Sequence, residues 1–217
     1  MNLLEKNYEP KDFEERIYQK WLEKRYFHAD ENTTKKTFSI MMPPPNITGV
    51  LHMGHGMDNT LQDVIVRYKR MQGFETLWVP GIDHASIATE AKIVAKMKEE
   101  GLTKEQIGRE EFLKRAWEWK EKYGGTILTQ LRKMGVSCDW DRVSFTMDEN
   151  LTRAVKKVFV DLYNKGLIYK GERMINWCPT CKTSISDAEV EYQEEPGHLW
   201  HIRYCDSGNG EGRIWNL

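Results

Sequence analysis

Long hydrophobic runs are missing from the sequence, and cysteines are few. No stretch approaches the roughly 18 consecutive apolar residues that a membrane-spanning helix needs. The first residues are charged throughout and lack an apolar segment followed by small residues, so they do not read as a secretory signal. The four cysteines form no regular framework, which argues against a disulfide scaffold. We therefore expect a soluble, cytoplasmic protein.

An excess of charge of either sign is also missing. The 32 lysines and arginines nearly balance the 33 acidic residues, which leaves a net charge of -1. Because local patches rather than totals drive contact with nucleic acids, this balance neither predicts nor excludes such a partner. Hydrophobic residues make up 40% of the chain and include eight Trp, nine Tyr and seven Phe. This composition excludes a disordered or collagen-like protein.

The spacing of apolar residues predicts an α/β fold. Residues 38–42 form a short β-prone run that stops at Pro43, residues 53–71 have helical periodicity, and the run at 75–81 is again short and apolar. A strand, a helix and a strand in this order form a βαβ unit, whose two strands are parallel. One face of the helix should be buried, formed by Met57, Leu61, Val64, Ile65 and Tyr68.

Further helices are predicted on either side of this unit, and small β units after them. The helical ranges are 12–27, 87–100, 104–133 and 149–166. In the longest of them, Gly124 and Gly125 are expected to introduce a kink. Cys138, outside the helices, is expected to be a buried packing residue.

The stretch PPPNITGVLHMGHG, residues 43–56, contains prolines, glycines and two histidines and leads into the helix of the predicted βαβ unit. A loop that enters a helix after a strand presents backbone N–H groups and the positive end of the helix dipole, which attract anions. His52 and His55 lie one turn apart and can donate to a phosphate, while Gly54 leaves room for a flat ring. From the residues alone, surface, capping or metal-binding histidines remain alternatives.

The same stretch resembles the His-x-Gly-His signature of class I aminoacyl-tRNA synthetases, which is met here by residues 52–55. Its Pro-Pro-Pro-Asn lead-in is similar to that of the valyl members of the class. Three further blocks resemble valyl members in the same order. They are GIDHASIATE at 81–90, VSCDWDRVSFTMDE at 136–149 and INWCPTCKTSISDAEVEY at 175–192.

The resemblance implies a Rossmann-like parallel sheet, of which this chain carries the first half, and ligation of valine to tRNA. The valine carboxylate attacks the α-phosphate of ATP, which is bound with Mg²⁺, and the valyl group then passes to tRNA(Val). Such catalysis rests on positioning and on stabilising phosphate charge, a role that the family gives to His52 and His55. The implied ATP-binding residues are His52, Gly54, His55 and Asp58, and the implied amino-acid-binding residues are Pro44, Asn46 and Asp83. We expect a monomer.

Asp83 and the cysteine pair at positions 178 and 181 each have more than one interpretation. Asp83, taken alone, is equally consistent with an Asx turn or a helix cap. Cys178 and Cys181 have the two-residue spacing that lets two thiolates face one tetrahedral zinc ion, and so form half of a zinc site. A redox pair is less consistent with the sequence, because no thioredoxin-like βαβ unit surrounds them. The resemblance implies that the other two zinc ligands lie much further along such chains.

The chain also departs from the family. Nothing in it matches the Lys-Met-Ser-Lys-Ser loop, and the tail from Cys205 onward does not continue the family pattern. Valyl members are several times longer, so we interpret the chain as an N-terminal fragment with little or no activity of its own. The expected parts are a helical extension at 1–36, the first half of the catalytic domain at 37–172, a zinc-knuckle-like connector at 173–196 and the start of an editing insertion at 197–217.

Two other functional classes remain open on the residues alone. A nucleotidylyltransferase has a related nucleotide signature on a shorter α/β domain, but it lacks the last two of the blocks above. A non-catalytic module that binds zinc or nucleic acid would use the cysteine pair and the tryptophans, although core packing explains the tryptophans more simply. Dependence of ATP turnover on an amino acid separates the first class from a ligase, and metal content tests the second.

Overall fold

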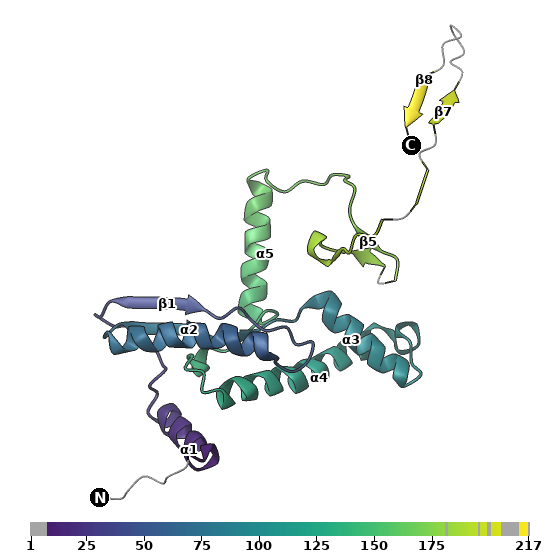
Figure 1. Ribbon diagram of the computed structural model, residues 1–217. Helices are drawn as coiled ribbons and strands as arrows, with labels where there is room; N and C mark the ends of the chain where they lie inside the picture. Colours follow the sequence, from purple (N-terminus) through teal and green to yellow (C-terminus); the bar gives the residue numbers. More distant parts are fainter. Residues whose placement is uncertain (1–7, 181, 195, 199–200, 205–212, 217) are drawn as a thin grey trace, which may run out of the picture. The chain divides into compact units, whose positions relative to one another are not determined.

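The computed structural model describes residues 8–180, 182–194, 196–198, 201–204 and 213–216. The chain divides into two units, Met1–Tyr169 and Lys170–Leu217. Within the described residues, every α-helix lies in the first unit (Figure 1).

The first unit is built on a parallel pair of strands that a helix connects. β1 (Thr37–Met41) and β2 (Glu75–Val79) pair in parallel, from Thr37 opposite Glu75 to Met41 opposite Val79. α2 (Met53–Met71; Figure 1) joins the two strands, and it packs on β2. The predicted βαβ unit is therefore confirmed, and its helix has the predicted bounds.

The strand pairing continues beyond Pro80. β3 (Gly81–Ile82) pairs in parallel with β4 (Ser144–Phe145). On the other side, a single parallel bridge joins Asn46 to Asp83. Parallel strands end at the same edge of a sheet, which is where ligands bind in open α/β sheets. The segments that follow β1, β3 and β4 are therefore neighbours at this edge.

The other helices occupy the predicted ranges, with differences at the ends. They are α1 (Pro10–Glu23), α3 (Ser86–Glu99), α4 (Lys104–Lys133) and α5 (Glu149–Asn164). Pro10 suits the first turn of α1, where a missing N–H costs nothing. α1 stops before the predicted residue 27, because Arg25 takes a left-handed φ of 52°.

The predicted kink of α4 at Gly124 and Gly125 is wrong, because the break lies at Gly108. Gly108 has φ 71° and ψ 176°, a conformation that favours glycine. Gly124 is instead a packing residue: a Cβ at this position would lie 2.7 Å from Cδ1 of Ile82. The missing side chain thus lets α4 approach the sheet closely.

The hydrophobic core lies between α2, α4 and the strands. Trp78, Ile127, Leu131 and Cys138 are completely buried in it. The indole N–H of Trp78 donates to Oε1 of Gln62 on α2 at 3.1 Å, so the largest core side chain keeps a hydrogen bond. Burial raises the pKa of the Cys138 thiol. Cys138 is therefore an inert packing residue, as predicted.

α2 turns inward a different face from the one predicted. The five apolar residues of the predicted face are between 49% and 69% exposed. The buried residues of the helix are Asn59 and Val66. Beside them, Asp63 accepts the N–H of Ser137 at 2.9 Å, and Arg70 donates to the carbonyl of Ser137 at 2.7 Å. The inward face of α2 is therefore held by hydrogen bonds to a segment far along the chain as well as by apolar packing.

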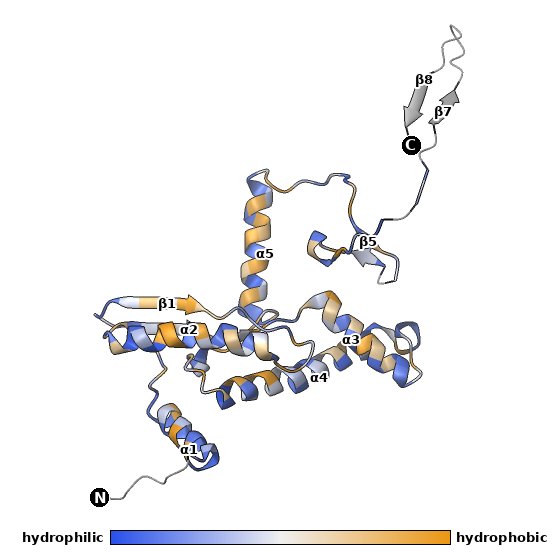
Figure 2. Ribbon diagram, in the orientation of Figure 1, coloured by the Kyte–Doolittle hydropathy of each residue, from blue (hydrophilic) through white to orange (hydrophobic). Residues whose placement is uncertain are grey.

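α5 also presents apolar side chains to solvent in this chain. Val155, Phe159 and Tyr163 are each more than half exposed. They are spaced four residues apart and so share one stripe, and Figure 2 shows hydrophobic residues along this helix. Neither α5 nor another helix of the described residues has the length and apolarity that a bilayer crossing needs.

In its described residues the second unit contains short antiparallel pairs, which agree with the predicted small β units. β5 (Trp177–Cys178) pairs with β6 (Thr183–Ser184), and β7 (His201–Tyr204) pairs with β8 (Arg213–Asn216). A 3-10 turn, Asp187–Glu189, follows β6, and the carboxylate of Glu189 accepts the backbone N–H of Ser186 at 3.0 Å.

Substitution of the two neighbouring glycines in α4 tests the close approach of this helix to the sheet. Gly124→Leu should lower the free energy of unfolding, because overpacking against Ile82 costs about 1–3 kcal/mol. Gly125→Leu is the matched control, since nothing beyond the neighbouring backbone of its own helix lies within 4 Å of its added Cβ. It should raise the same free energy by up to about 1 kcal/mol through helix propensity. Urea denaturation measures both, and equal effects would contradict the packing role.

Candidate active site

The two signature histidines form a capping box at the start of α2. His52 is the N-cap residue, and its Nδ1 accepts the N–H of Gly54 at 3.1 Å. In return, Nδ1 of His55 accepts the N–H of His52 at 3.2 Å. A Cβ on Gly54 would lie 3.0 Å from Cε1 of His52, so this glycine leaves room for the folded-back imidazole. Two backbone N–H groups that the helix leaves without partners are thereby satisfied.

The capping box determines which tautomer each ring adopts. A neutral imidazole has one N–H and one acceptor nitrogen. Because Nδ1 of both rings accepts a backbone N–H, the proton of each neutral ring lies on Nε2. The ring centroids are 3.9 Å apart, so both rings are close enough to contact the same ligand group. The arrangement leaves a pair of Nε2–H donors at a helix N-terminus, where the helix dipole also favours an anion.

The neutral state of His55 is favoured in the folded chain. Burial lowers the pKa of His55, and the neighbouring His52 lowers it further, whereas Asp58 raises it. The capping interaction requires an unprotonated Nδ1, so the lowered pKa and the cap support each other. Asp58 itself lies in the second turn of α2, is exposed, and accepts a hydrogen bond from Gln62 at 2.9 Å.

The three residues predicted to bind the amino acid meet at the sheet edge. The N–H of Asp83 donates to the carbonyl of Pro45 at 2.8 Å, and the N–H of Ile47 donates to the carbonyl of Asp83 at 2.9 Å. Pro45 and Ile47 are buried, while Pro44 and Asn46 between and beside them are exposed. Pro44 and Asn46 therefore face away from the core, next to Asp83.

Asp83 is also held from its other side. Its Oδ1 accepts the hydroxyl of Thr146 at 3.0 Å and the N–H of Ala85 at 3.3 Å. Thr146 directly follows β4, and its hydroxyl also accepts the N–H of His84 at 2.9 Å. Sequence reasoning assigned no role to Thr146 or His84. The parallel register of β3 and β4, which places Thr146 beside Asp83, is the signal that reveals them.

The chain matches a known protein family over most of its length. The family profile described as tRNA synthetases class I (I, L, M and V) matches residues 16–204.

The chain belongs to this family.

Its relatives include proteins named valine--tRNA ligase. The chain is 56% identical over 204 residues to the Fusobacterium nucleatum protein of this name. It is 57% identical over 204 residues to the Clostridium perfringens protein. Each match covers 94% of this synthetase chain and 23% of the relative. The chain is also 56% identical over 210 residues to the Bacteroides thetaiotaomicron protein. This match covers 97% of the chain and 24% of the relative. The chain thus spans about a quarter of the length of these relatives.

A solved structure shares the class I synthetase fold. The ternary complex of Agrobacterium radiobacter K84 agnB2 LeuRS with tRNA and LeuAMS aligns with a TM-score of 0.70. The alignment covers 85% of this chain and 22% of the LeuRS chain, at 23% sequence identity. At this identity the likeness concerns the fold, and it supports the Rossmann-like interpretation of the first unit.

One cysteine of the predicted zinc half-site of this synthetase chain can be placed. Cys178 ends β5 and is half-buried, and its carbonyl accepts the N–H of Lys182 at 2.8 Å, which closes a tight turn. Such a turn suits a zinc knuckle, whose two thiolates come from residues a short distance apart. Cys181 lies outside the described residues. The assignment of zinc to this pair therefore stays a prediction.

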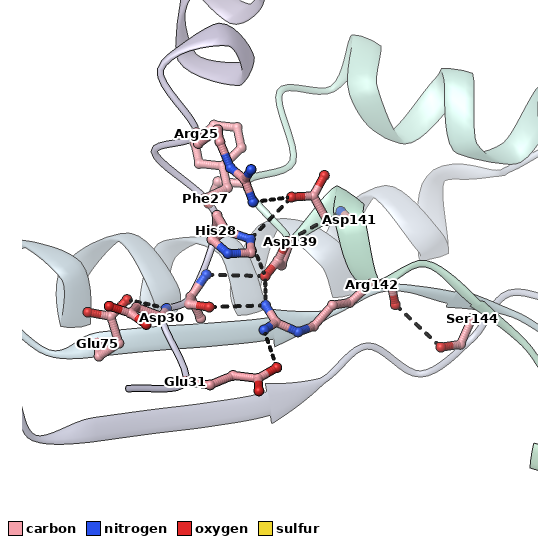
Figure 3. A network of polar contacts seen from close by, with 12 residues as sticks. Arg25, Phe27, His28, Asp30, Glu31, Glu75, Asp139, Asp141, Arg142 and Ser144 are labelled. Carbon is pink, nitrogen blue, oxygen red and sulfur yellow. Dashed lines mark hydrogen bonds and ion pairs between the residues drawn. The ribbon is translucent and has the colours of Figure 1, made fainter. Parts of the chain in front are cut away.

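A different group of potential metal ligands belongs to a structural cluster. In the described part of the chain, ligand atoms of His28, Asp139 and Asp141 lie within 4.8 Å of one another. Figure 3 shows that two guanidinium groups already contact these carboxylates: Arg142 pairs with Asp139, and Arg25 pairs with Asp141 at 2.8 Å. Because Asp139 also accepts the N–H of Ala29 at 3.1 Å, the cluster ties the segment after α1 to the SCDW block.

A cavity beside α1 lies away from the candidate site. It measures about 1140 Å³ and lies between α1 and the neighbouring parts of α2 and α4. Trp21, Asp63 and Arg132 are among its lining residues, whereas the signature histidines and Asp83 lie at the sheet edge. The candidate site is therefore defined by convergent side chains rather than by this cavity.

The capping box predicts how stability depends on pH. The pKa of folded His55 lies below its ordinary value of about 6.5, so the unfolded chain binds the proton first as the pH falls. The stabilisation is therefore present above about pH 6.5 and is lost as the pH falls through the lowered value. His55→Gln retains an acceptor at this position and does not titrate. Urea denaturation from pH 5 to 8 should give a shallower dependence for His55→Gln, and parallel curves would contradict this prediction.

Proposed function

We propose that this chain forms the N-terminal half of the site at which a valine--tRNA ligase activates valine. In this reaction the valine carboxylate attacks the α-phosphate of ATP, pyrophosphate leaves, and the valyl group is then transferred to tRNA(Val). The observation that carries the proposal is the meeting of Pro44, Asn46 and Asp83 at the sheet edge from which the chain enters α2. Identity of 52–57% to proteins named valine--tRNA ligase supports valine as the substrate.

His52 and His55 act on the phosphates in this proposal. Each neutral ring offers an Nε2–H donor, because its Nδ1 is used in the capping box. Donors that are fixed before the reaction stabilise charge that grows on phosphate oxygens in the transition state. ATP binds with Mg²⁺, and Asp58 and Gly54 complete the nucleotide side of the site. The protein supplies no nucleophile, because the carboxylate of the substrate attacks directly.

The amino acid occupies the space beside these donors. The Asp83 carboxylate receives the α-ammonium group, and its half-buried position strengthens this ion pair relative to water. Pro44 and Asn46 border the side-chain pocket, where a rigid proline wall leaves room for a small branched side chain. This pocket selects valine over larger aliphatic side chains by steric exclusion.

The remaining parts of the chain receive the roles implied by the relatives. We assign residues 1–36 to a helical extension, 37–172 to the first half of the catalytic domain and 173–196 to a zinc-knuckle-like connector with Cys178 and Cys181 as ligands. Residues 197–217 begin an editing insertion. The break between the two units at Tyr169 and Lys170 supports a boundary close to the connector.

Valine-dependent exchange between ATP and pyrophosphate tests the proposed reaction. The 217 residues contain no Lys-Met-Ser-Lys-Ser loop, so we expect the chain to bind ATP and valine weakly and to catalyse little exchange. Exchange at the rate of a full-length relative would contradict the half-site. In saturation-transfer NMR, valine should bind at least about tenfold more tightly than isoleucine, which is larger by one methylene. A chain that binds no valine would contradict the proposed function.

Two substitutions separate the phosphate-binding role of the histidines from their capping role. His52→Asn and His55→Gln retain acceptors for the capping box, but their amide NH2 groups cannot take the positions of the imidazole Nε2–H donors. Each should weaken ATP binding about tenfold, because a hydrogen bond to a charged group is lost, while the melting temperature stays close to that of the wild type. Isothermal titration with ATP and thermal denaturation measure the two effects. Unchanged ATP affinity with a lowered melting temperature would assign the histidines to capping alone.

A further inference from the structure

We propose that Thr146 is a positioning residue for the amino-acid subsite, acting through Asp83. This inference rests on the proposed function and deepens it, since it identifies what orients the carboxylate that receives the ammonium group. Thr146 lies in the VSCDWDRVSFTMDE block, 63 residues after Asp83.

The strand register brings the two residues together. Ile82 and Phe145 are partners in the parallel pairing of β3 with β4, so Asp83 and Thr146 are the next residues along each strand. The N–H of Thr146 donates to the carbonyl of Ile82 at 3.2 Å, which anchors its backbone at this point. On its other side, Asp83 forms the bridge with Asn46. The three strand ends thus lie in the order Asn46, Asp83, Thr146.

The hydrogen-bond inventory of the threonine hydroxyl determines the direction of each contact. The hydroxyl lies 3.0 Å from Oδ1 of Asp83, 2.9 Å from the backbone nitrogen of His84 and 2.6 Å from Nδ1 of the same histidine. An ionised carboxylate only accepts and a backbone N–H only donates. The single hydroxyl hydrogen therefore points to Asp83, and Nδ1–H of His84 donates to the hydroxyl oxygen. In this arrangement the one donor and both lone pairs of the hydroxyl are used.

The consequence is a carboxylate whose two oxygens have different tasks. The hydrogen bonds that the described residues make to the Asp83 carboxylate, from Thr146 and Ala85, both end on Oδ1. Oδ2 is thereby presented to a ligand, and the side chain of Asp83 is 32% exposed at the edge where Pro44 and Asn46 lie. A carboxylate held by its inner oxygen loses less freedom when it binds an ammonium group, which makes the ion pair stronger.

Substitution of Thr146 in the full 217-residue chain tests this positioning role. Thr146→Val removes the hydroxyl and keeps the volume of the side chain, whereas Thr146→Ala removes both. Thr146→Ser retains the hydroxyl. Saturation-transfer NMR measures the dissociation constants of valine and of 3-methylbutanoate, which has the same carbon skeleton and carboxylate but no ammonium group. Thr129→Val is the matched control, because its hydroxyl bonds only within α4, to the carbonyl of Gly125 at 2.9 Å.

We expect Val and Ala at position 146 to weaken valine binding about tenfold, as the loss of a hydrogen bond to a charged group does. Binding of 3-methylbutanoate should be unchanged, and the Ser variant and the Thr129→Val control should bind valine as the wild type does. The amide resonance of His84 should shift in the Val and Ala variants and return with Ser, which reports the contact independently of any ligand.

Three outcomes would overturn the inference. Valine affinity that is unchanged in both Val and Ala variants, with a wild type that binds valine, would reject the role of Thr146 and leave the proposed function standing. Equal losses for valine and 3-methylbutanoate would show a general structural effect instead of control of the ammonium site. A wild-type chain that binds no valine would reject the proposed function itself, and the positioning role with it.

Discussion

Two backbone hydrogen bonds between residues 45–47 and Asp83 hold the candidate site together. They run from the N–H of Asp83 to the carbonyl of Pro45 and from the N–H of Ile47 to the carbonyl of Asp83. Because side chains alternate along an extended segment, burial of Pro45 and Ile47 in the core sends Pro44 and Asn46 outward. The same pairing fixes the position of Asp83 and of residues 45–47, from which the chain continues into α2. A shift of one residue in this register would exchange the core face and the site face.

Elements determined by local patterns could be predicted from the sequence. The bounds of α2 follow from its histidine cap and its periodic apolar residues, and the strands on either side follow from short β-prone runs between prolines and glycines. The orientation of α2 could not be predicted in the same way. Its inward residues, including Asp63 and Arg70, bond to Ser137, which is more than 60 residues away in the chain. Periodicity identifies an apolar face but not the segments that the helix contacts.

The glycines of α4 and the role of Thr146 illustrate the same limit. Gly108, Gly124 and Gly125 all stand in one helical pattern, yet one breaks the helix, one packs on Ile82 and one faces open space. Their roles depend on φ and on neighbours that the sequence does not contain. Thr146 stood within a recognised block, but its contact with Asp83 requires the register of β3 and β4. The identities of site residues thus follow from motifs, whereas their mutual orientation follows from tertiary pairing.

The capping box of α2 makes the proton distribution of the site a property of the backbone. In solution an imidazole exchanges between two tautomers, and a ligand that needs one of them must select it when it binds. Here the helix N-terminus has made this selection through the N–H groups of His52 and Gly54. The hydrogen atoms that would face a polyphosphate are therefore in position in the ligand-free chain, and binding requires little reorganisation of the two rings. A change in helix geometry, even without loss of either histidine, would alter the chemistry that this edge of the sheet can perform.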